Sequence, residues 1–275
     1  MLGRDKKNTM HKLAFDHAVI YVPNLHKAIR QFTAFGFTVK PGGEHAHTHN
    51  ALIIFNDRSY IELLALKPSW RRWFLLGIAK SGMLDLIANS KSDIGWRVMR
   101  WIGCKHGPID WALRTDNMDL TLAGLAENDA VLLNTSDYQR TTAEGKTARW
   151  TMASAKNLDL PFLIQDQTDI NLRVPLGNPT QHANGALGIK KITISAENTE
   201  LAHSNLGALL SLSDKDLKGV NTKLKLQETT IEYKKLSHLV GKFILEIRYQ
   251  GSETKLLNCD YPKGTKIWLT PSDSH

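Results

Sequence analysis

The sequence predicts an α+β fold made of repeated βαβββ units. Strand-like apolar runs and a short amphipathic helix follow each other in one order. This order recurs at intervals of roughly 50–60 residues, which is typical of stacked supersecondary units. The chain has 275 residues, 42% of them hydrophobic and 23% charged. This is ordinary globular composition, long enough for one large or two smaller domains, and it excludes intrinsic disorder as the main state.

The first unit spans residues 14–66. Asn24 fits the N-cap of a helix whose apolar residues recur at helical spacing, and Gly36 favours the end of that helix. A Pro-Gly-Gly turn at 41–43 is expected after a short strand. The expected elements are strands at 15–22, 37–39, 51–55 and 60–66 and a helix at 25–35.

The same order recurs in two further units. Asp116 or Asn117 caps the expected helix of the second unit, which runs through Leu122 and Leu125. The expected strands of the second unit lie at 110–115, 131–133, 147–153 and 160–165. The third and less regular unit has a strand at 189–195, a helix near 201–210 and strands near Lys223, Ile231, Phe243 and Ile267.

Two segments interrupt the repeats. Residues 169–185 are rich in Pro, Gly and Asn and are expected to form a linker. Residues 67–107 are too long for a simple loop. They hold four of the seven tryptophans and eight basic against two acidic residues, a net charge of +6. This mixture suits a helical lid over a cleft, a helical pair packed on the sheet, or a membrane or nucleic-acid contact, and we favour the first two.

The whole chain is basic, with a net charge of +8 and a pI of about 9.4. Such a charge favours an acidic partner, whether nucleic acid, a membrane surface or an anionic substrate. Two distant cysteines exclude a disulfide scaffold, and no apolar run is long enough for a signal peptide or a membrane span. The sequence also lacks nucleotide-binding, serine-hydrolase and nucleic-acid-binding motifs. We therefore expect a cytoplasmic protein that binds neither nucleic acid nor membranes.

Side-chain alternation gives the first and last strands of the first unit two distinct faces. Small and branched residues form the face that the helix is expected to cover, and His17 and Glu62 both point away from it. A carboxylate in the middle of an apolar strand is costly unless it is paired or metal-bound. A hydrogen-bonded His–Glu pair with a purely structural role is the alternative.

Several short motifs form a pattern along the first two thirds of the chain. They are Phe15–Val22, Phe35–Val39, Pro41–Gly43 with His45, Thr48 with Asn50 and Leu52, Tyr60–Leu64, Leu160–Ile164 and His182–Ala186. Together they resemble the glyoxalase-like branch of the vicinal oxygen chelate superfamily over roughly residues 14–200. The resemblance implies two paired βαβββ units around a cleft in an open barrel-like sheet. It also implies a divalent metal held by the first and last strands of each unit.

The resemblance carries a ligand set with it. The implied metal ligands are His17, Glu62, Asp110 and Gln165, and the implied ion is Mn, Fe, Ni, Zn or Mg. In the third unit the equivalent positions fall on Lys190 or Lys191 and on Trp268, which do not suit a metal, although Glu246 is an alternative to Trp268. We therefore expect the third unit to be degenerate and structural.

The segment 44–50 contains three histidines that share one face if the chain is extended, a geometry that can bind zinc or nickel. A polar loop with chance histidines is the simpler interpretation. Only His45 of the three matches the family pattern, and its ordinary pKa suits a general base. We expect His45 and Glu62 as catalytic residues and Tyr21, Thr48, Asn50 and Tyr60 as substrate-binding residues.

The expected organisation is a glyoxalase-like domain at 14–168, with the insertion 67–107, and a third unit at 186–272. The expected function is a divalent-metal-dependent lyase, isomerase or dioxygenase acting on a small oxygenated molecule. The alternative is a metal-free protein that binds or sequesters a small molecule in the same cleft. The expected partner is that small molecule, and a homodimer is compatible with the sequence.

Overall fold

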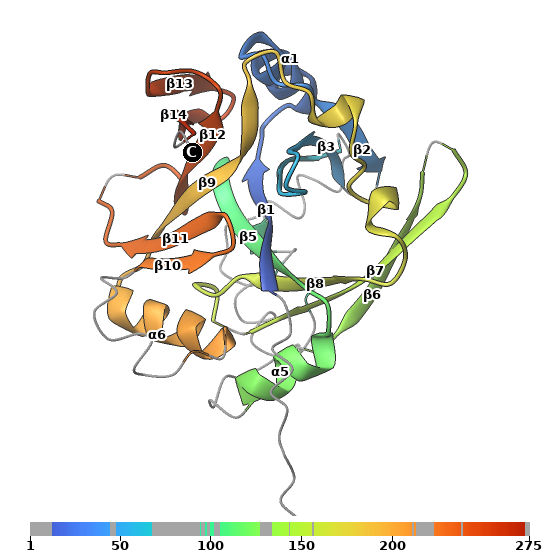
Figure 1. The fold of residues 1–275 in the computed structure, drawn as a ribbon, viewed down its shortest axis with the longest axis vertical. Helices are drawn as coiled ribbons and strands as arrows, with labels where there is room; N and C mark the ends of the chain where they lie inside the picture. Colours follow the sequence, from blue (N-terminus) through green and yellow to red (C-terminus); the bar gives the residue numbers. More distant parts are fainter. Residues whose placement is uncertain are drawn as a thin grey trace, which may run out of the picture.

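The structure of the protein is a computed structural model. It describes residues 13–44, 48–67, 94, 97, 100–101, 105–126, 134–142, 144–155, 157–210, 212, 223–237 and 239–272. Within these residues the strands form two sheets, and the helices are short (Figure 1). None of the helices in this part of the chain has the length and hydropathy needed to cross a membrane.

The first sheet is barrel-like and has eight strands in the described residues. Its strands are β1 (Leu13–Tyr21), β2 (Lys40–Glu44), β3 (Thr48–Ile54), β4 (Tyr60–Leu66), β5 (Gly107–Thr115), β6 (Ser136–Thr141), β7 (Thr147–Ser154) and β8 (Phe162–Asp166). They lie in the order β2-β3-β4-β1-β5-β8-β7-β6. Helices α1 (Leu25–Ala34) and α5 (Met118–Ala126) follow the first strand of each unit. The α+β fold of paired βαβββ units is thus confirmed.

The second sheet has six strands in the described residues and lies beside β1 and β5 (Figure 1). Its strands are β9 (Ala186–Ser195), β10 (Lys223–Leu226), β11 (Thr229–Lys234), β12 (Phe243–Tyr249), β13 (Lys255–Asp260) and β14 (Lys263–Pro271). They lie in the order β10-β11-β9-β12-β14-β13, and helix α6 (Thr199–Leu209) follows β9. The linker before β9 contains two short 3₁₀ turns, η1 (Ile170–Leu172) and η2 (Asn178–Thr180).

The two sheets share one central pattern. In the first, β1 pairs parallel with β4 and antiparallel with β5, and β5 pairs parallel with β8. In the second, β9 takes the place of β1, with β11, β12 and β14 as its counterparts of β4, β5 and β8. Residues 186–272 therefore contain two shortened units, whereas the sequence predicts one. The second of them lacks a helix, since β12 leads directly to β13.

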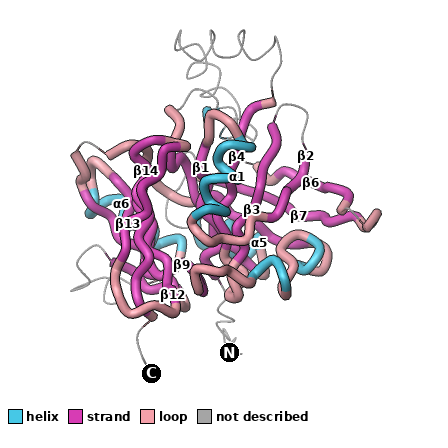
Figure 2. Tube along the Cα trace, turned by 90° about the horizontal axis from the view of Figure 1, so that it is seen from above, coloured by secondary structure: helices cyan, strands magenta, loops and turns pink. Residues whose placement is uncertain are grey.

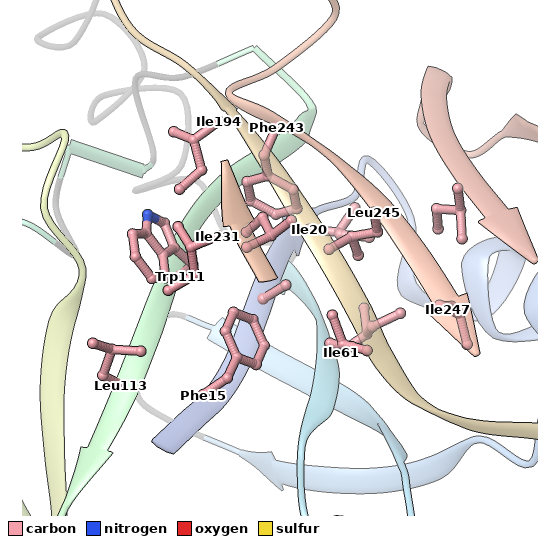
Figure 3. Packing of buried hydrophobic residues seen from close by; sticks show 14 of the residues in the cluster. Phe15, Ile20, Ile61, Trp111, Leu113, Ile194, Ile231, Phe243, Leu245 and Ile247 are labelled. Atoms are coloured by element: carbon pink, nitrogen blue, oxygen red, sulfur yellow. The ribbon is translucent and has the colours of Figure 1, made fainter. Parts of the chain in front are cut away.

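The main core lies between the two sheets (Figure 3). Ile20 and Trp111 of the first sheet belong to the same buried cluster as Ile194, Phe243 and Leu245 of the second. Helix α1 adds its buried face to this core and packs on β3 and β4 (Figure 2). Because this face of the first sheet is apolar and covered, the polar side chains of β1 and β4 are left to the opposite face.

Some predicted elements differ from the structure. Residues 37–39 are not a strand. The Pro-Gly-Gly segment forms part of β2, whose pairing with β3 is irregular between residues Pro41 and Glu44. Strand β13 is not predicted by the sequence, because it is mostly exposed and lacks apolar alternation. The predicted strand 131–133 and most of the insertion 67–107 lie outside the described residues.

Candidate functional site

A β-bulge in β1 brings two neighbouring side chains to one face of the first sheet. The pairing of β1 with β5 shifts between Phe15 and His17, so that Asp16 has no direct partner. Asp16 and His17 then both contact side chains on the face opposite the main core. The Asp16 carboxylate oxygen Oδ1 lies 2.7 Å from His17 Nδ1, and both side chains are almost fully buried.

His17 lies at the centre of a group of polar and aromatic side chains. Its Nε2 atom lies 3.6 Å from Glu62 Oε2. Its ring stacks on Tyr60 at 4.4 Å between centroids and meets the edge of Phe162 at 5.2 Å. Asn50 Nδ2 donates to Glu62 Oε1 at 2.6 Å, which fixes that carboxylate. The structure thus brings together His17 and Glu62, as alternation predicts.

Arg173, in the linker after η1, holds this site from the other side. Its guanidinium donates to both oxygens of Asp16 at 2.9 Å and to both oxygens of Asp166 at 2.6 and 2.8 Å. It also donates to the Tyr60 hydroxyl at 3.0 Å. Burial alone would raise the pKa of Asp16, but Arg173 and His17 hold it well below its usual range. Asp16 therefore stays ionised, and burial raises the pKa of Tyr60, which stays a neutral phenol.

Asp110 is on the predicted face, but its carboxylate is already engaged. Arg97 donates to both of its oxygens at 2.6 Å, and Trp101 Nε1 donates to one of them at 2.8 Å. Arg97 also bonds Ser154 Oγ and the carbonyl of Leu160. Burial opposes the charge of Asp110, yet Arg97 keeps its pKa below the ordinary value. The Arg97 guanidinium is therefore the cation that binds this carboxylate, in the place where the sequence predicts a metal ion.

Gln165 lies away from the site. It is on the opposite face of β8 from Phe162, where its side chain accepts from the backbone N–H of Met118 at 2.7 Å, at the start of α5. The pairing of the strands shows which residue occupies the position expected for Gln165. Glu62 pairs with Val19, two residues after His17, and Phe162 pairs with Ala112, two residues after Asp110.

The described residues therefore do not assemble the predicted four-ligand metal set. Phe162 stands at the second acidic position, and Asp110 is bound by Arg97. No group of three His, Cys, Asp or Glu side chains in the described ranges could hold a metal ion together. His17 and Glu62 remain as half of a donor set.

The predicted substrate-binding residues fall on or near the same face. Tyr60 stacks on His17, and Asn50 contacts Glu62. Thr48 lies two residues before Asn50 on β3 and therefore on the same face of the strand. Tyr21 lies further along β1, where the centroid of its ring is 4.7 Å from that of His106. The predicted catalytic residue His45 lies outside the described residues.

An apolar surface continues this face past Tyr21. Val19, Tyr21, Leu64 and Phe162 form a buried cluster to which Ile94 and Trp101 of the insertion belong. Residues 94, 97, 100 and 101 are helical. In these four residues, then, the insertion packs as a helix on the sheet face that carries His17.

Four residues of the site are not predicted by the sequence pattern: Asp16, Arg173, Asp166 and Arg97. Strict alternation assigns Asp16 to the core face, since the bulge that turns it round leaves no mark in composition. Arg173 lies in a segment identified only as a linker. Asp166 sits one residue after the expected end of its strand. The single available signal was the adjacency of Asp16 and His17.

The fold and site thus define an α+β protein of repeated βαβββ units with a buried His–carboxylate group on one sheet face. The model of the glyoxalase-like domain matches residues 15–210, so the chain belongs to the glyoxalase-like domain family. No curated protein matches the sequence significantly.

The chain is similar to several solved structures at low sequence identity. A hypothetical protein from Staphylococcus aureus has a TM-score of 0.69 and 18% identity, over 94% of this chain and 100% of that one. The Mn(II)-bound glyoxalase from Novosphingobium aromaticivorans gives 0.48 and 10%, over 95% and 83%. Methylmalonyl-CoA epimerase from Mycobacterium tuberculosis gives 0.34 and 14%, over 60% and 91%. The first of these shows that the whole fold, both sheets included, occurs in another protein.

Proposed function

We propose that the protein is an enzyme of the lyase or isomerase kind that moves a proton on a small oxygenated molecule, with His17 as the proton acceptor. The contact that carries this proposal is the 2.7 Å bond between His17 Nδ1 and Asp16. An ionised Asp16 accepts the Nδ1 proton, which leaves the lone pair on Nε2, the atom that faces Glu62. A buried carboxylate that orients an imidazole in this way is a common basis of general-base catalysis.

Glu62 is the second reacting group in this proposal. Its side chain is 15% exposed, against 4% for His17, so that it is the more accessible of the two. Asn50 holds one of its oxygens and leaves the other within 3.6 Å of His17 Nε2. A carboxylate here stabilises the imidazolium that forms when His17 accepts a proton, and it offers a route for the proton out of the site.

The test is hydrogen exchange in D₂O, followed by proton NMR, on a panel of aldehydes, ketones and 2-oxo acids. We expect deuterium at the carbon next to a carbonyl of at least one compound, and a loss of about 10²-fold or more in His17→Gln. His26→Gln, an exposed histidine of α1, is the matched control and should retain full activity. Exchange that survives in His17→Gln would contradict the proposal. Tight binding without exchange would favour the sequestration alternative.

A divalent metal at the same pair is the second candidate. Two ligands at about 2.1 Å from a tetrahedral ion are about 3.4 Å apart, close to the observed separation of His17 Nε2 and Glu62 Oε2. A carboxylate on the other ring nitrogen, as Asp16 provides, is the usual support of a metal-bound histidine. A bound ion would polarise a substrate oxygen.

Elemental analysis of protein purified without chelator tests this candidate. If a metal occupies this pair, the protein will carry about one ion per chain, selected from Mn, Fe, Ni, Zn or Mg, and both His17→Ala and Glu62→Ala will lose it. His17 would then be a ligand instead of the proton acceptor. If the protein cannot be loaded with any of these ions, the metal candidate is wrong and proton transfer by His17 remains as the proposed function. His45→Ala in the hydrogen-exchange assay tests the remaining predicted catalytic residue.

A further inference from the structure

The ring of His182 attaches the linker to the first sheet, at a point between η2 and β9. Its Nδ1 atom accepts from the backbone N–H of Thr38 at 3.0 Å. Its Nε2 atom lies 3.0 Å from the carbonyl oxygen of Ile54, at the end of β3. One imidazole thus joins three segments of the chain: the linker, the segment after α1 and the end of β3.

These two contacts fix the protonation state of the ring. A backbone N–H can only donate, so Nδ1 must present its lone pair to Thr38. A carbonyl oxygen can only accept, so Nε2 must carry the proton that Ile54 receives. His182 therefore fits its place only as the neutral imidazole with its proton on Nε2. An imidazolium would turn a second N–H towards that of Thr38 and break this hydrogen bond.

Apolar rings surround His182 where it meets the first unit. The centroid of its ring lies 5.6 Å from that of Phe37 and 5.3 Å from that of Phe55, and both phenylalanines are buried. Partial burial disfavours the charged form and lowers the pKa of His182 below its ordinary value. The ring is therefore neutral at pH values near 7 and gains its charge only in acid.

The elements packed against His182 carry a few charged side chains. They are Lys40 at the start of β2, Asp57 and Arg58 in the turn after β3, and Asp169 and Arg173 in the linker itself. No charged side chain of the described residues, these five included, forms an ion pair or a hydrogen bond with His182. Protonation of Nδ1 thus removes the bond from Thr38 and gains no anionic partner in exchange.

The attachment point on β3 also supports the segment that carries Arg173. Val174, the next residue, is buried in one cluster with Ile54, whose carbonyl contacts His182. Arg173 in turn donates to both oxygens of Asp16. The contact of His182 and the anchor of Arg173 therefore share one strand residue.

We propose that His182 is a pH-sensitive clamp, which fastens the linker to the first sheet at neutral pH and opens when acid protonates Nδ1. Contacts of Gln181 and Asn184 with residues 35–38 remain, so that the opening is local. The clamp does not depend on the proposed function, since it acts on the attachment of the linker and not on a reaction.

The pH range of the opening follows from the direction of the pKa shift. The pKa of His182 is lower in the folded protein than in the unfolded chain, where it is about 6.5. The folded protein therefore binds this proton less readily than the unfolded chain does. The clamp is fully formed above that value and is lost as the pH falls below it.

Long-range ¹H–¹⁵N NMR spectra of the histidine rings test the protonation state in the unaltered protein. At about pH 7.5 we expect the ring of His182 to be neutral, with its proton on Nε2. A proton on Nδ1, or a ring that is already charged at this pH, would overturn the proposal.

Amide hydrogen exchange of Thr38 tests the opening. Between about pH 7 and about pH 5 we expect its protection factor, corrected for the intrinsic effect of pH, to fall about tenfold, as the loss of one hydrogen bond allows. The amide of Ala28, which bonds the carbonyl of Asn24 at 3.0 Å in α1, is the control and should keep its protection. A constant ratio between the two amides would exclude the opening.

Three variants assign the effect to His182. His182→Gln places an amide there that can accept from Thr38 and donate to Ile54 but does not titrate, so the pH dependence should vanish. His182→Ala should show the low protection of Thr38 at both pH values. His26→Gln, an exposed histidine of α1, should behave as the unaltered protein does. A pH dependence that persists in His182→Gln would assign the change to another group and refute the clamp.

Discussion

The buried pair of Arg97 and Asp110 stabilises the fold, and its loss is a sharp test of the structure at single residues. Asp110→Ala leaves a buried guanidinium without its carboxylate, and such changes cost about 3–5 kcal/mol. We expect urea denaturation to show a loss of this size. The double variant Arg97→Met with Asp110→Leu should be much less destabilised, since no charge remains buried. A loss below about 1 kcal/mol in Asp110→Ala would contradict the pairing.

Acid stability follows from the same buried carboxylates. Despite burial, Arg173 and His17 lower the pKa of Asp16, and Arg97 lowers that of Asp110. The unfolded value for Asp is about 3.9. Their stabilisation is therefore fully present above that value and is lost as the pH falls below it.

We expect the free energy of unfolding to decline as the pH is lowered from about 5 towards 3. Urea titrations at a series of pH values measure it. Asp110→Asn should show a shallower decline, because one of the two depressed carboxylates has been removed. A free energy that is constant or rises over this range would exclude the proposed charge states.

For single residues, the sequence correctly predicts the strand face of those side chains that follow regular alternation. His17 and Glu62 lie on the face expected for them because β4 and most of β1 are regular strands. Arg97 and Arg173 could not be found in this way, because neither lies on a strand and a long side chain from outside the sheet can reach a site from many directions. The partner of Asp110 thus depends on tertiary packing that a strand pattern does not contain.

Helix α1 shows how a local signal and a distant contact act together on one element. Asn24 caps it through the N–H of Lys27, as predicted. Gly36 follows its end with a φ of 86°, and the linker packs against it, with Asn184 Nδ2 donating to the carbonyl of Phe35. The end of the helix therefore serves as the attachment point of the linker.

Gly36→Ala tests this attachment. A Cβ at Gly36 would lie 2.9 Å from Asn184 Cβ and from its backbone nitrogen, and the left-handed backbone would cost about 1–2 kcal/mol in addition. Gly145 has a similar φ of 76° with no atom within 4 Å, so Gly145→Ala carries the backbone cost alone. We expect thermal denaturation to show a larger loss for Gly36→Ala. Equal losses would mean that the linker contact contributes nothing.

Elements with strong apolar patterns are the ones that the sequence predicts well. β4 begins and ends as expected, since six of its seven residues are hydrophobic and buried, on both faces of the strand. β2 and β13 were misplaced or missed because neither shows apolar alternation: β2 consists of Lys, Pro, Gly and Glu, and the two leucines of β13 are adjacent. Pairing with a neighbouring strand alone makes them strands. Backbone pairing at a sheet edge thus leaves little trace in the sequence.

The two sheets form one core, and this defines how the whole molecule unfolds. Ile20 and Trp111 lose their cover if the second sheet is absent, because Ile194 and Phe243 belong to the same cluster. We expect a fragment of residues 13–185 to bind a hydrophobic dye and to lack a cooperative thermal transition. The full chain should unfold in one transition. A fragment that unfolds sharply would make 14–168 and 186–272 independent domains.

Because the two sheets pair their strands in the same register, equivalent positions in them can be compared residue by residue. Glu232 pairs with Thr193, two residues after Lys191, so Lys191 and Glu232 stand where His17 and Glu62 stand in the first sheet. Three lysines, Lys191, Lys223 and Lys234, surround Glu232 at 3.2–3.7 Å. A lysine amine thus stands in the second sheet where an imidazole stands in the first. The same backbone frame appears twice with different chemical groups, so that the molecule is chemically one-sided although its architecture is nearly symmetric.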